Sequence, residues 1–179
     1  MSPLRALALA ATAAALPIAA LAAGNPSPPK PTETTRNCPE GTVWSDRHEG
    51  CLVIRDSRLT DNDRMEVARE LAYHGRPADA AALLAGHSAP DDADVLTLRG
   101  FATRKAGDWN GGVALYRAAL AREPDHWLAR SYLGLGLYER GDRAAAAAQL
   151  AAIRASGGRG TWAERALDAA LRDGVVSDY

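Results

Sequence analysis

The chain has 179 residues, a formal net charge of −1 and two cysteines. Its 21 Lys and Arg residues are balanced by 22 Asp and Glu residues, so the composition provides no excess of positive charge for binding nucleic acid or an anionic membrane surface. The length is sufficient for one domain with its own hydrophobic core, even after removal of a leader sequence.

Residues 1–22 have the three parts of a secretory signal sequence. A single early cation, Arg5, is followed by a long uncharged stretch rich in alanine, which ends in a small-x-small pattern at 20–22. An uncleaved membrane anchor is the alternative, because residues 6–23 are just long enough to span a bilayer. Alanine is only weakly hydrophobic, however, and Pro17 interrupts the stretch. We therefore expect a cleaved signal peptide, a periplasmic or secreted protein, and no membrane insertion after cleavage.

Residues 23–37 are rich in proline and polar side chains, and we expect them to form a disordered or polyproline-like spacer. The next segment, 38–56, has the pattern of a small β-hairpin. Its extended runs, 42–44 and 52–54, are separated by turn residues. An isolated hairpin is only marginally stable, so we expect it to pack against the C-terminal part of the chain through Trp44.

The two cysteines, Cys38 and Cys51, both belong to this hairpin. An even cysteine count in an exported chain predicts a disulfide bond between them. The alternative is a metal ion bound by both cysteines and His48, but their spacing matches no common zinc pattern. The sequence therefore favours a disulfide and predicts no metal site.

The pattern changes to a helical one at Thr60, where capping and acidic residues precede a run of helix-forming residues. Short turns marked by glycine or proline separate the helical segments up to the end of the chain. No alternating strand pattern occurs after Ile54. The predicted helices cover residues 61–74, 77–86, 92–106, 109–122, 126–140, 142–156 and 161–173.

An internal repeat runs through these helices. Residues 99–125 align with residues 133–158 at a constant offset of 34, and an earlier copy is offset by 32. In each unit a small residue in the first helix is followed twelve positions later by a small residue in the second helix, so that two antiparallel helices can approach closely. The three pairs are Ala68 and Ala80, Gly100 and Gly112, and Gly134 and Ala146.

These units, with their Gly-Asp turns and their closing Pro90 and Pro124, resemble the tetratricopeptide repeat, a helix-turn-helix unit of 34 residues. The resemblance covers residues 61–158. It implies an all-α helix-turn-helix solenoid of three repeats within a helical domain at 57–175, preceded by the disulfide-closed hairpin. The helix at 161–173 would be the capping helix that such arrays use. The third unit departs from the pattern, since it lacks the closing proline.

The Gly134-x-Gly136 pair is also the kind of pattern that begins a phosphate-binding loop. Such a loop needs a preceding strand and a Lys-Ser/Thr pair or a ribose-binding acid, and the sequence has none of these. No histidine pair with zinc-ligand spacing and no nucleophile elbow occurs either. The sequence therefore predicts a non-catalytic protein without a cofactor.

The resemblance further implies a concave inner face, lined by the first helix of each unit, that binds an extended peptide or a helix of a partner protein. Aromatic side chains and arginine are common in binding hot spots. The alternative for this face is that the protein's own capping helix or hairpin fills it. The alternative for the function is a small structural subunit docked permanently in a larger cell-envelope complex. The predicted partner-binding residues are Arg69, Tyr73, Phe101, Arg104, Lys105, Tyr132, Leu135 and Tyr138.

Overall fold

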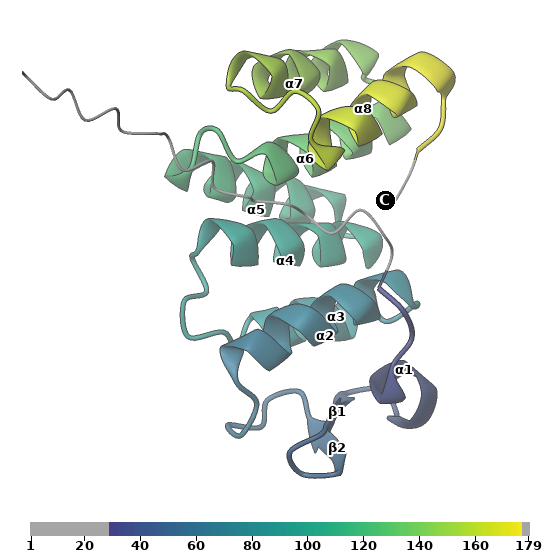
Figure 1. The fold of residues 1–179 in the computed structure, drawn as a ribbon, viewed down its shortest axis with the longest axis vertical. Coiled ribbons are helices and arrows are strands. Elements are labelled where there is room, and N and C mark those ends of the chain that lie inside the picture. The colour runs from purple at the N-terminus through teal and green to yellow at the C-terminus, as the bar shows by residue number, and fades with distance from the viewer. Residues whose placement is uncertain (1–28, 177–179) are drawn as a thin grey trace, which may run out of the picture.

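A computed structural model describes residues 29–176, so the predicted signal sequence and the first part of the predicted spacer lie outside the described residues. The described chain is mainly helical, with a two-stranded antiparallel sheet near its start (Figure 1). The elements are α1 (Glu33–Asn37), β1 (Thr42–Ser45), β2 (Gly50–Val53), α2 (Asp61–Tyr73), α3 (Pro77–Leu84), α4 (Ala93–Lys105), α5 (Trp109–Arg122), α6 (Trp127–Glu139), α7 (Arg143–Ala155) and α8 (Trp162–Asp173).

Helices α2 to α7 pack in sequential pairs, and the pairs stack on one another from α2 and α3 at one end to α6 and α7 at the other (Figure 1). The hairpin and α1 lie at the α2 end, and α8 covers the α6–α7 end. This confirms the prediction of paired helices preceded by a disulfide-closed hairpin. All seven predicted helices are present, and each observed boundary is within two residues of the predicted one.

The Gly-Asp pairs mark the turns inside the second and third helix pairs. Gly107 and Gly141 have φ angles of 97° and 83°, in the left-handed region that glycine adopts without steric cost and in which helices often end. The following aspartates cap the next helix, because the carboxylate of Asp108 accepts a hydrogen bond from the amide of Gly111 and that of Asp142 accepts one from Ala145. Each Gly-Asp pair therefore ends the first helix of its helix pair and begins the second.

The small residues predicted at the contacts allow α4 and α5 to touch backbone to backbone. A Cβ atom added at Gly112 would lie 2.9 Å from the carbonyl oxygen of Gly100, and one added at Gly100 would lie 2.9 Å from the ring of Tyr116. The third pair of small residues, Gly134 and Ala146, differs from the prediction in part. Gly134 is closest to Leu167 of α8, at 2.5 Å from an added Cβ, so its small size also admits the last helix.

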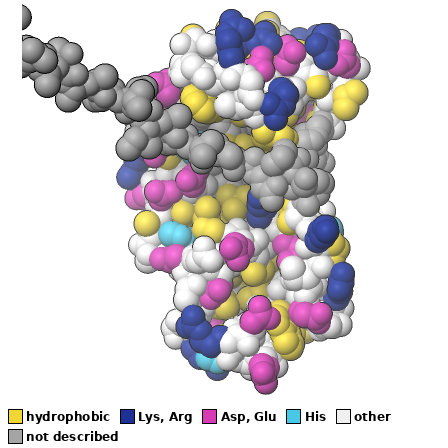
Figure 2. All heavy atoms as spheres, in the orientation of Figure 1, with side chains coloured by type: hydrophobic (Ala, Val, Ile, Leu, Met, Phe, Trp, Pro, Cys, Tyr) yellow, Lys and Arg dark blue, Asp and Glu magenta, His cyan; other side chains and the backbone are white. Residues whose placement is uncertain are grey.

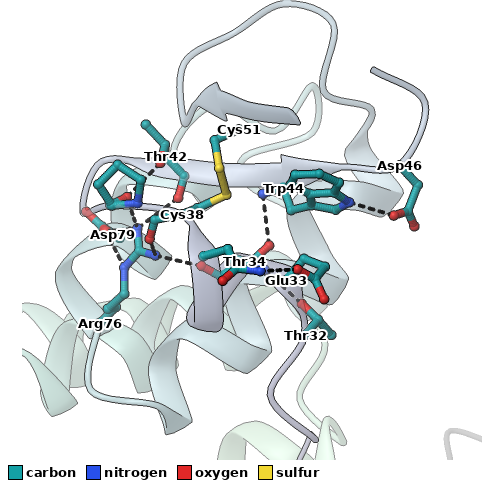
Figure 3. The surroundings of a disulfide bond; sticks show 12 residues. Thr32, Glu33, Thr34, Cys38, Thr42, Trp44, Asp46, Cys51, Arg76 and Asp79 are labelled. Carbon is teal, nitrogen blue, oxygen red and sulfur yellow. Dashed lines mark hydrogen bonds and ion pairs between the residues drawn. A yellow bond between two sulfur atoms is a disulfide. The ribbon is translucent and has the colours of Figure 1, made fainter. Parts of the chain in front are cut away.

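In the hairpin, Val43 and Leu52 are directly opposite each other and both are buried. The expectation that Trp44 is the packing residue was wrong. Side chains alternate between the two faces of a strand, so Trp44 points away from Val43, is only half-buried, and donates an indole hydrogen bond to Asp46 (Figure 3). Val43 and Leu52 are the residues that the hairpin turns toward the core.

The predicted disulfide is present. Cys38 precedes β1, Cys51 lies in β2, and their sulfur atoms are 2.03 Å apart. The bond uses both thiols, which overturns the alternative of a metal ion held by these cysteines and His48.

The predicted spacer is partly ordered, in contrast to the expectation of disorder up to residue 37. Residues 33–37 form helix α1, with the side chain of Thr32 capping its N-terminus. Thr34 is buried against the hairpin, where its hydroxyl accepts a hydrogen bond from the amide of Trp44 (Figure 3). This stretch has almost no apolar side chains, so hydrogen bonds between its threonine hydroxyls and the folded domain hold it in place.

Candidate binding face

Four aromatic side chains form a continuous row across the first helices of the pairs and α8. We call Tyr73, Phe101, Tyr132 and Trp162 the aromatic row. The ring of Tyr73 in α2 is stacked on that of Phe101 in α4, with 5.0 Å between centroids, and Phe101 is stacked on Tyr132 in α6 at 4.8 Å. Trp162, at the start of α8, meets Tyr132 edge to face at 5.9 Å. Offset and edge-to-face pairs each add about 0.5–1.5 kcal/mol to the burial of the rings.

The structure brings most of the predicted binding residues to this row, at two depths. Phe101, Tyr132 and Leu135 are only 0%, 3% and 2% exposed, and therefore belong to the packed interior. The other five predicted residues are half-buried: Arg69, Tyr73, Arg104, Lys105 and Tyr138. The repeat pattern did not point to Trp162, because this residue lies in the predicted capping helix and not in a repeat.

Two cations at the end of α4 flank the row. The guanidinium carbon of Arg104 lies 5.8 Å from the ring centroid of Phe101, and the ammonium nitrogen of Lys105 lies 5.7 Å from it. Both distances are within the range of cation–π attraction. Arg104 also forms an ion pair with Glu139 at the end of α6. These contacts hold positive charge beside the aromatic rings.

The Gly134-x-Gly136 pair lies inside α6 and serves packing, as predicted. A Cβ atom at Gly136 would lie 2.6 Å from the indole of Trp109 and 3.0 Å from the Cδ atom of Arg104. The glycine therefore makes room for the first side chain of α5 and for the stem of the arginine. Because the pair is in mid-helix, its amides are used in helical hydrogen bonds and are not available to a phosphate.

Residues 29–35, which we call the strap, are joined to α2 by hydrogen bonds. The carboxylate of Glu70 is 3% exposed and accepts three hydrogen bonds from the strap, one from the amide of Thr32 at 2.7 Å and two from hydroxyls. The hydroxyls are those of Thr32, at 2.7 Å, and Thr35, at 2.6 Å. One turn further along α2, Nε2 of His74 lies 2.8 Å from the carbonyl oxygen of Pro29. Buried polar groups are stable only when they are paired in this way.

Arg76, in the turn between α2 and α3, fastens the hairpin to the helices. Its guanidinium donates to the carboxylate of Asp79 and to four carbonyl groups of the N-terminal segment (Figure 3). Asp79 in turn accepts a hydrogen bond from the amide of Gly41 at 2.9 Å. The four carbonyl groups belong to Thr34, Cys38, Pro39 and Thr42.

Sequence reasoning did not find Glu70, His74, Arg76 or Asp79. Charged residues near a helix end usually face solvent, and the partners of these four in the N-terminal segment lie more than 30 positions earlier in the chain. The one signal in the sequence was the repeat itself, because Glu70 aligns with Ala102 and Gly136 in the later units. A charged residue at a position where the other two units have small residues indicates that this position has a different neighbour in the first unit.

The surface view in Figure 2 shows hydrophobic side chains at several places on the face turned to the viewer, with acidic side chains between them in its lower half. Basic side chains lie mostly toward the top and the edges of this face. In the range 29–176, no three His, Cys, Asp or Glu side chains are arranged to hold a metal ion. No helix within the same range is long and apolar enough to cross a membrane.

Comparison with protein-family models, with curated proteins and with solved structures finds no match for this chain.

Proposed function

We propose that this chain is an exported, non-catalytic protein of the tetratricopeptide-repeat type that binds an extended segment of another protein on its inner face. The observation that carries the proposal is the aromatic row, in which the rings of Tyr73, Phe101 and Tyr132 stack across three successive first helices. Phe101 and Tyr132 are buried, so they support the row from within, while the half-buried residues beside them, Tyr73, Arg104 and Lys105, lie at its edge. Aromatic side chains and arginine are the residues that most often dominate the binding energy of protein interfaces.

The disulfide supports the proposed location in the periplasm or outside the cell, because structural disulfides persist in oxidising compartments. The repeat architecture supports the proposed mode of binding. Each first helix contributes side chains to one side of the stack, so a partner segment could contact α2, α4 and α6 in turn.

A permanently docked subunit is the second candidate, and the exposed surface disfavours it. Obligate interfaces are large and hydrophobic. Among the described residues, the large hydrophobic side chains that are exposed are Val53 and Val175, each 57% exposed. They lie in the hairpin and after α8, which are at opposite ends of the stack, and so do not form one patch.

The test is charge reversal at the edge of the row, Lys105→Glu, compared with the matched reversal Arg117→Glu on the exposed side of α5. Both variants should keep the helical circular dichroism spectrum. We expect Lys105→Glu to reduce capture of a crosslinked partner at least about tenfold, which corresponds to about 1.4 kcal/mol. Arg117→Glu should leave capture unchanged. Equal capture by both variants would count against the inner face as the binding site.

A further inference from the structure

Strand β2 has an outer edge that points away from β1. In an antiparallel pair of strands, residues that exchange backbone hydrogen bonds with the residue opposite alternate with residues that do not. The amide of Ile54 donates to the carbonyl of Gly41, which fixes the phase of this alternation in the hairpin. It follows that Cys51 and Val53 turn their backbone N–H and C=O groups away from β1, toward the outer edge of β2.

The outer edge of the other strand, β1, is already in use. The amide of Trp44 donates to the hydroxyl of Thr34 in α1 at 3.0 Å (Figure 3). The amide of Thr42 donates to the carbonyl of Pro39 at 3.1 Å, and the carbonyl of Thr42 accepts a hydrogen bond from Arg76 at 2.8 Å. The chain's own N-terminal segment and helices therefore cover this edge.

Three backbone groups on the outer edge of β2 are open. They are the amide and the carbonyl of Cys51 and the amide of Val53, and none of them has a hydrogen-bond partner within residues 29–176. The carbonyl of Val53 accepts a hydrogen bond from the amide of Asp56 at 2.8 Å and keeps a second lone pair. Both Cys51 and Val53 are exposed. An edge of this kind is a template for pairing with a further strand.

The charges that flank β2 fit a second copy of the same strand. Glu49 lies three positions before Leu52, and Arg55 lies three positions after it. Both are exposed, and neither side chain forms a hydrogen bond or an ion pair within the described part of the chain. When two copies of β2 pair antiparallel about a two-fold axis at Leu52, Glu49 of each copy comes opposite Arg55 of the other. Like charges in these places would oppose pairing, whereas opposite charges favour it.

The backbone at Glu49 gives a second, independent reason. Its φ angle of 48° is the one positive value at a non-glycine residue among the described residues. Glycine adopts this conformation without steric cost, and a residue with a longer side chain is retained there at some cost in strain. Since the carboxylate has no partner among the described residues of its own chain, its use would lie in another molecule.

We propose that two copies of this chain pair through the outer edges of β2, antiparallel about Leu52, and form a four-stranded sheet. In this register Cys51 of each copy exchanges backbone hydrogen bonds with Val53 of the other, and the exposed side chain of Val53 is covered by the second copy. The hairpin lies at the end of the helical stack, and β1 lies between β2 and α1, so α1 does not block the approach (Figures 1 and 3).

The inference does not depend on the proposed function, although a dimer would carry two inner faces. The contact is small, because two strands of four residues bury far less than the roughly 1,600 Å² of a standard stable interface. We therefore expect a weak dimer, with a Kd of about 0.1–1 mM. Sedimentation equilibrium of the chain that begins at Ala23 measures this Kd. A chain that stays monomeric at about 1 mM would overturn the proposal.

The register is tested by reversing the two charges separately. Glu49→Arg leaves a cation at both ends of β2, and Arg55→Glu leaves an anion at both ends, so each variant replaces two attractive contacts by two repulsive ones. We expect each variant alone to self-associate about tenfold more weakly than the wild type. An equimolar mixture of the two variants should associate as tightly as the wild type, because every cation then faces an anion.

This recovery also shows that both charge variants are folded. If each variant alone dimerises like the wild type, or if the mixture associates no better than its components, the antiparallel register about Leu52 is wrong.

The backbone pairing is tested at Val53. Val53→Pro removes the outward amide without removing a hydrogen bond between β1 and β2, and proline is tolerated on edge strands at such positions. Val53→Ala is the matched control, since it also removes the valine side chain but keeps the amide. We expect Val53→Pro to abolish self-association and Val53→Ala to weaken it by no more than about threefold. Equal self-association of the two variants would overturn strand pairing.

The dimer and the proposed inner face fail separately. Lys105→Glu, which tests the inner face, should leave the Kd of the dimer unchanged, and the measurement needs no partner protein. If the purified chain is monomeric and Val53→Pro, but not Val53→Ala, lowers capture of a protein in cells, the edge of β2 pairs with a strand of that protein. This result would overturn pairing with a second copy.

Discussion

Replacing Gly112 by alanine tests the close packing of α5 against α4. The new Cβ atom would lie 2.9 Å from the carbonyl oxygen of Gly100 and 3.1 Å from the amide nitrogen of Arg104. Both are backbone atoms of α4, so no side chain can rotate away to make room. The variant has to separate α4 from α5, which are otherwise in contact along their length.

Two opposing contributions decide whether Gly112→Ala lowers or raises the free energy of unfolding. Alanine is favoured over glycine inside a helix by about 1 kcal/mol, which stabilises the variant. Overpacking a well-packed contact costs about 1–3 kcal/mol, and more when the backbone has to move. Since the clash is with backbone on the facing helix, we take the upper part of that range and expect a net loss of about 2 kcal/mol. For a domain of this size this lowers the melting temperature by about 4–8 °C.

The assay is urea unfolding followed by circular dichroism, which gives the free energy of unfolding of each variant. Ala118→Gly is the matched control, because Ala118 is exposed on the same helix and reports the helix propensity term alone. We expect this control to lose about 1 kcal/mol. If Gly112→Ala is as stable as the wild type, or more stable, the helices do not depend on a small residue at this contact.

Three further predictions concern the N-terminal segment and the core. Replacing Cys38 and Cys51 by serine should lower the free energy of unfolding by about 3 kcal/mol in urea titrations, and equal stability would contradict this. Glu70→Ala leaves three donors without their acceptor and should cost about 2–3 kcal/mol in the same assay, whereas Glu66→Ala, at an exposed position of α2, should change little. Burial raises the pKa of Tyr116 to about 12, against the opposing charge of the nearby Arg104, so in an absorbance titration Tyr116→Phe should remove a late tyrosine ionisation.

The raised pKa of Tyr116 also predicts the direction in which stability changes at alkaline pH. Its pKa in the folded state is above the ordinary value near 10, so the unfolded state releases the proton first as the pH rises. Stability should therefore fall between about pH 10 and pH 12, and Tyr116→Phe should reduce this fall. An identical decline in the variant and the wild type would contradict the assignment.

The helical part of the fold could be predicted because its signals are local or periodic. Gly107 and Asp108 define a turn through their own conformational preferences, and the same pair recurs 34 residues later. The small residues Gly100 and Gly112 recur in the same way. A repeated pattern averages out the uncertainty of any single helix boundary, which is why each observed boundary falls within two residues of the predicted one.

The strap could not be predicted, because its stability comes from partners far away in sequence. Glu70 binds Thr32 across 38 positions, and neither residue has a local pattern that points to the other. Trp44 was misjudged for a related reason. The register Val43–Leu52 and Trp44–Cys51 decides which side of the hairpin faces the helices, and the sequence offers no turn signal strong enough to fix it.

The candidate site was predicted in outline only. The resemblance predicted Phe101 and Tyr132 as neighbours on successive first helices, and the structure has their rings stacked, but the resemblance did not indicate how deeply they are buried. Burial depends on the neighbouring helices and on Tyr116, whose ring lies 6.3 Å from that of Tyr132. These contacts involve three helices and have no counterpart in a single repeat.

Photocrosslinking in intact cells tests the central claim most directly. The crosslinking group is placed at Tyr138, at the half-buried edge of the inner face, and in a matched strain at Arg117 on the exposed side of α5. If the inner face binds a partner, the label at Tyr138 forms a discrete protein adduct that Lys105→Glu abolishes, and the label at Arg117 forms none. Adducts of equal yield from both positions, or adducts from Arg117 alone, would contradict the claim.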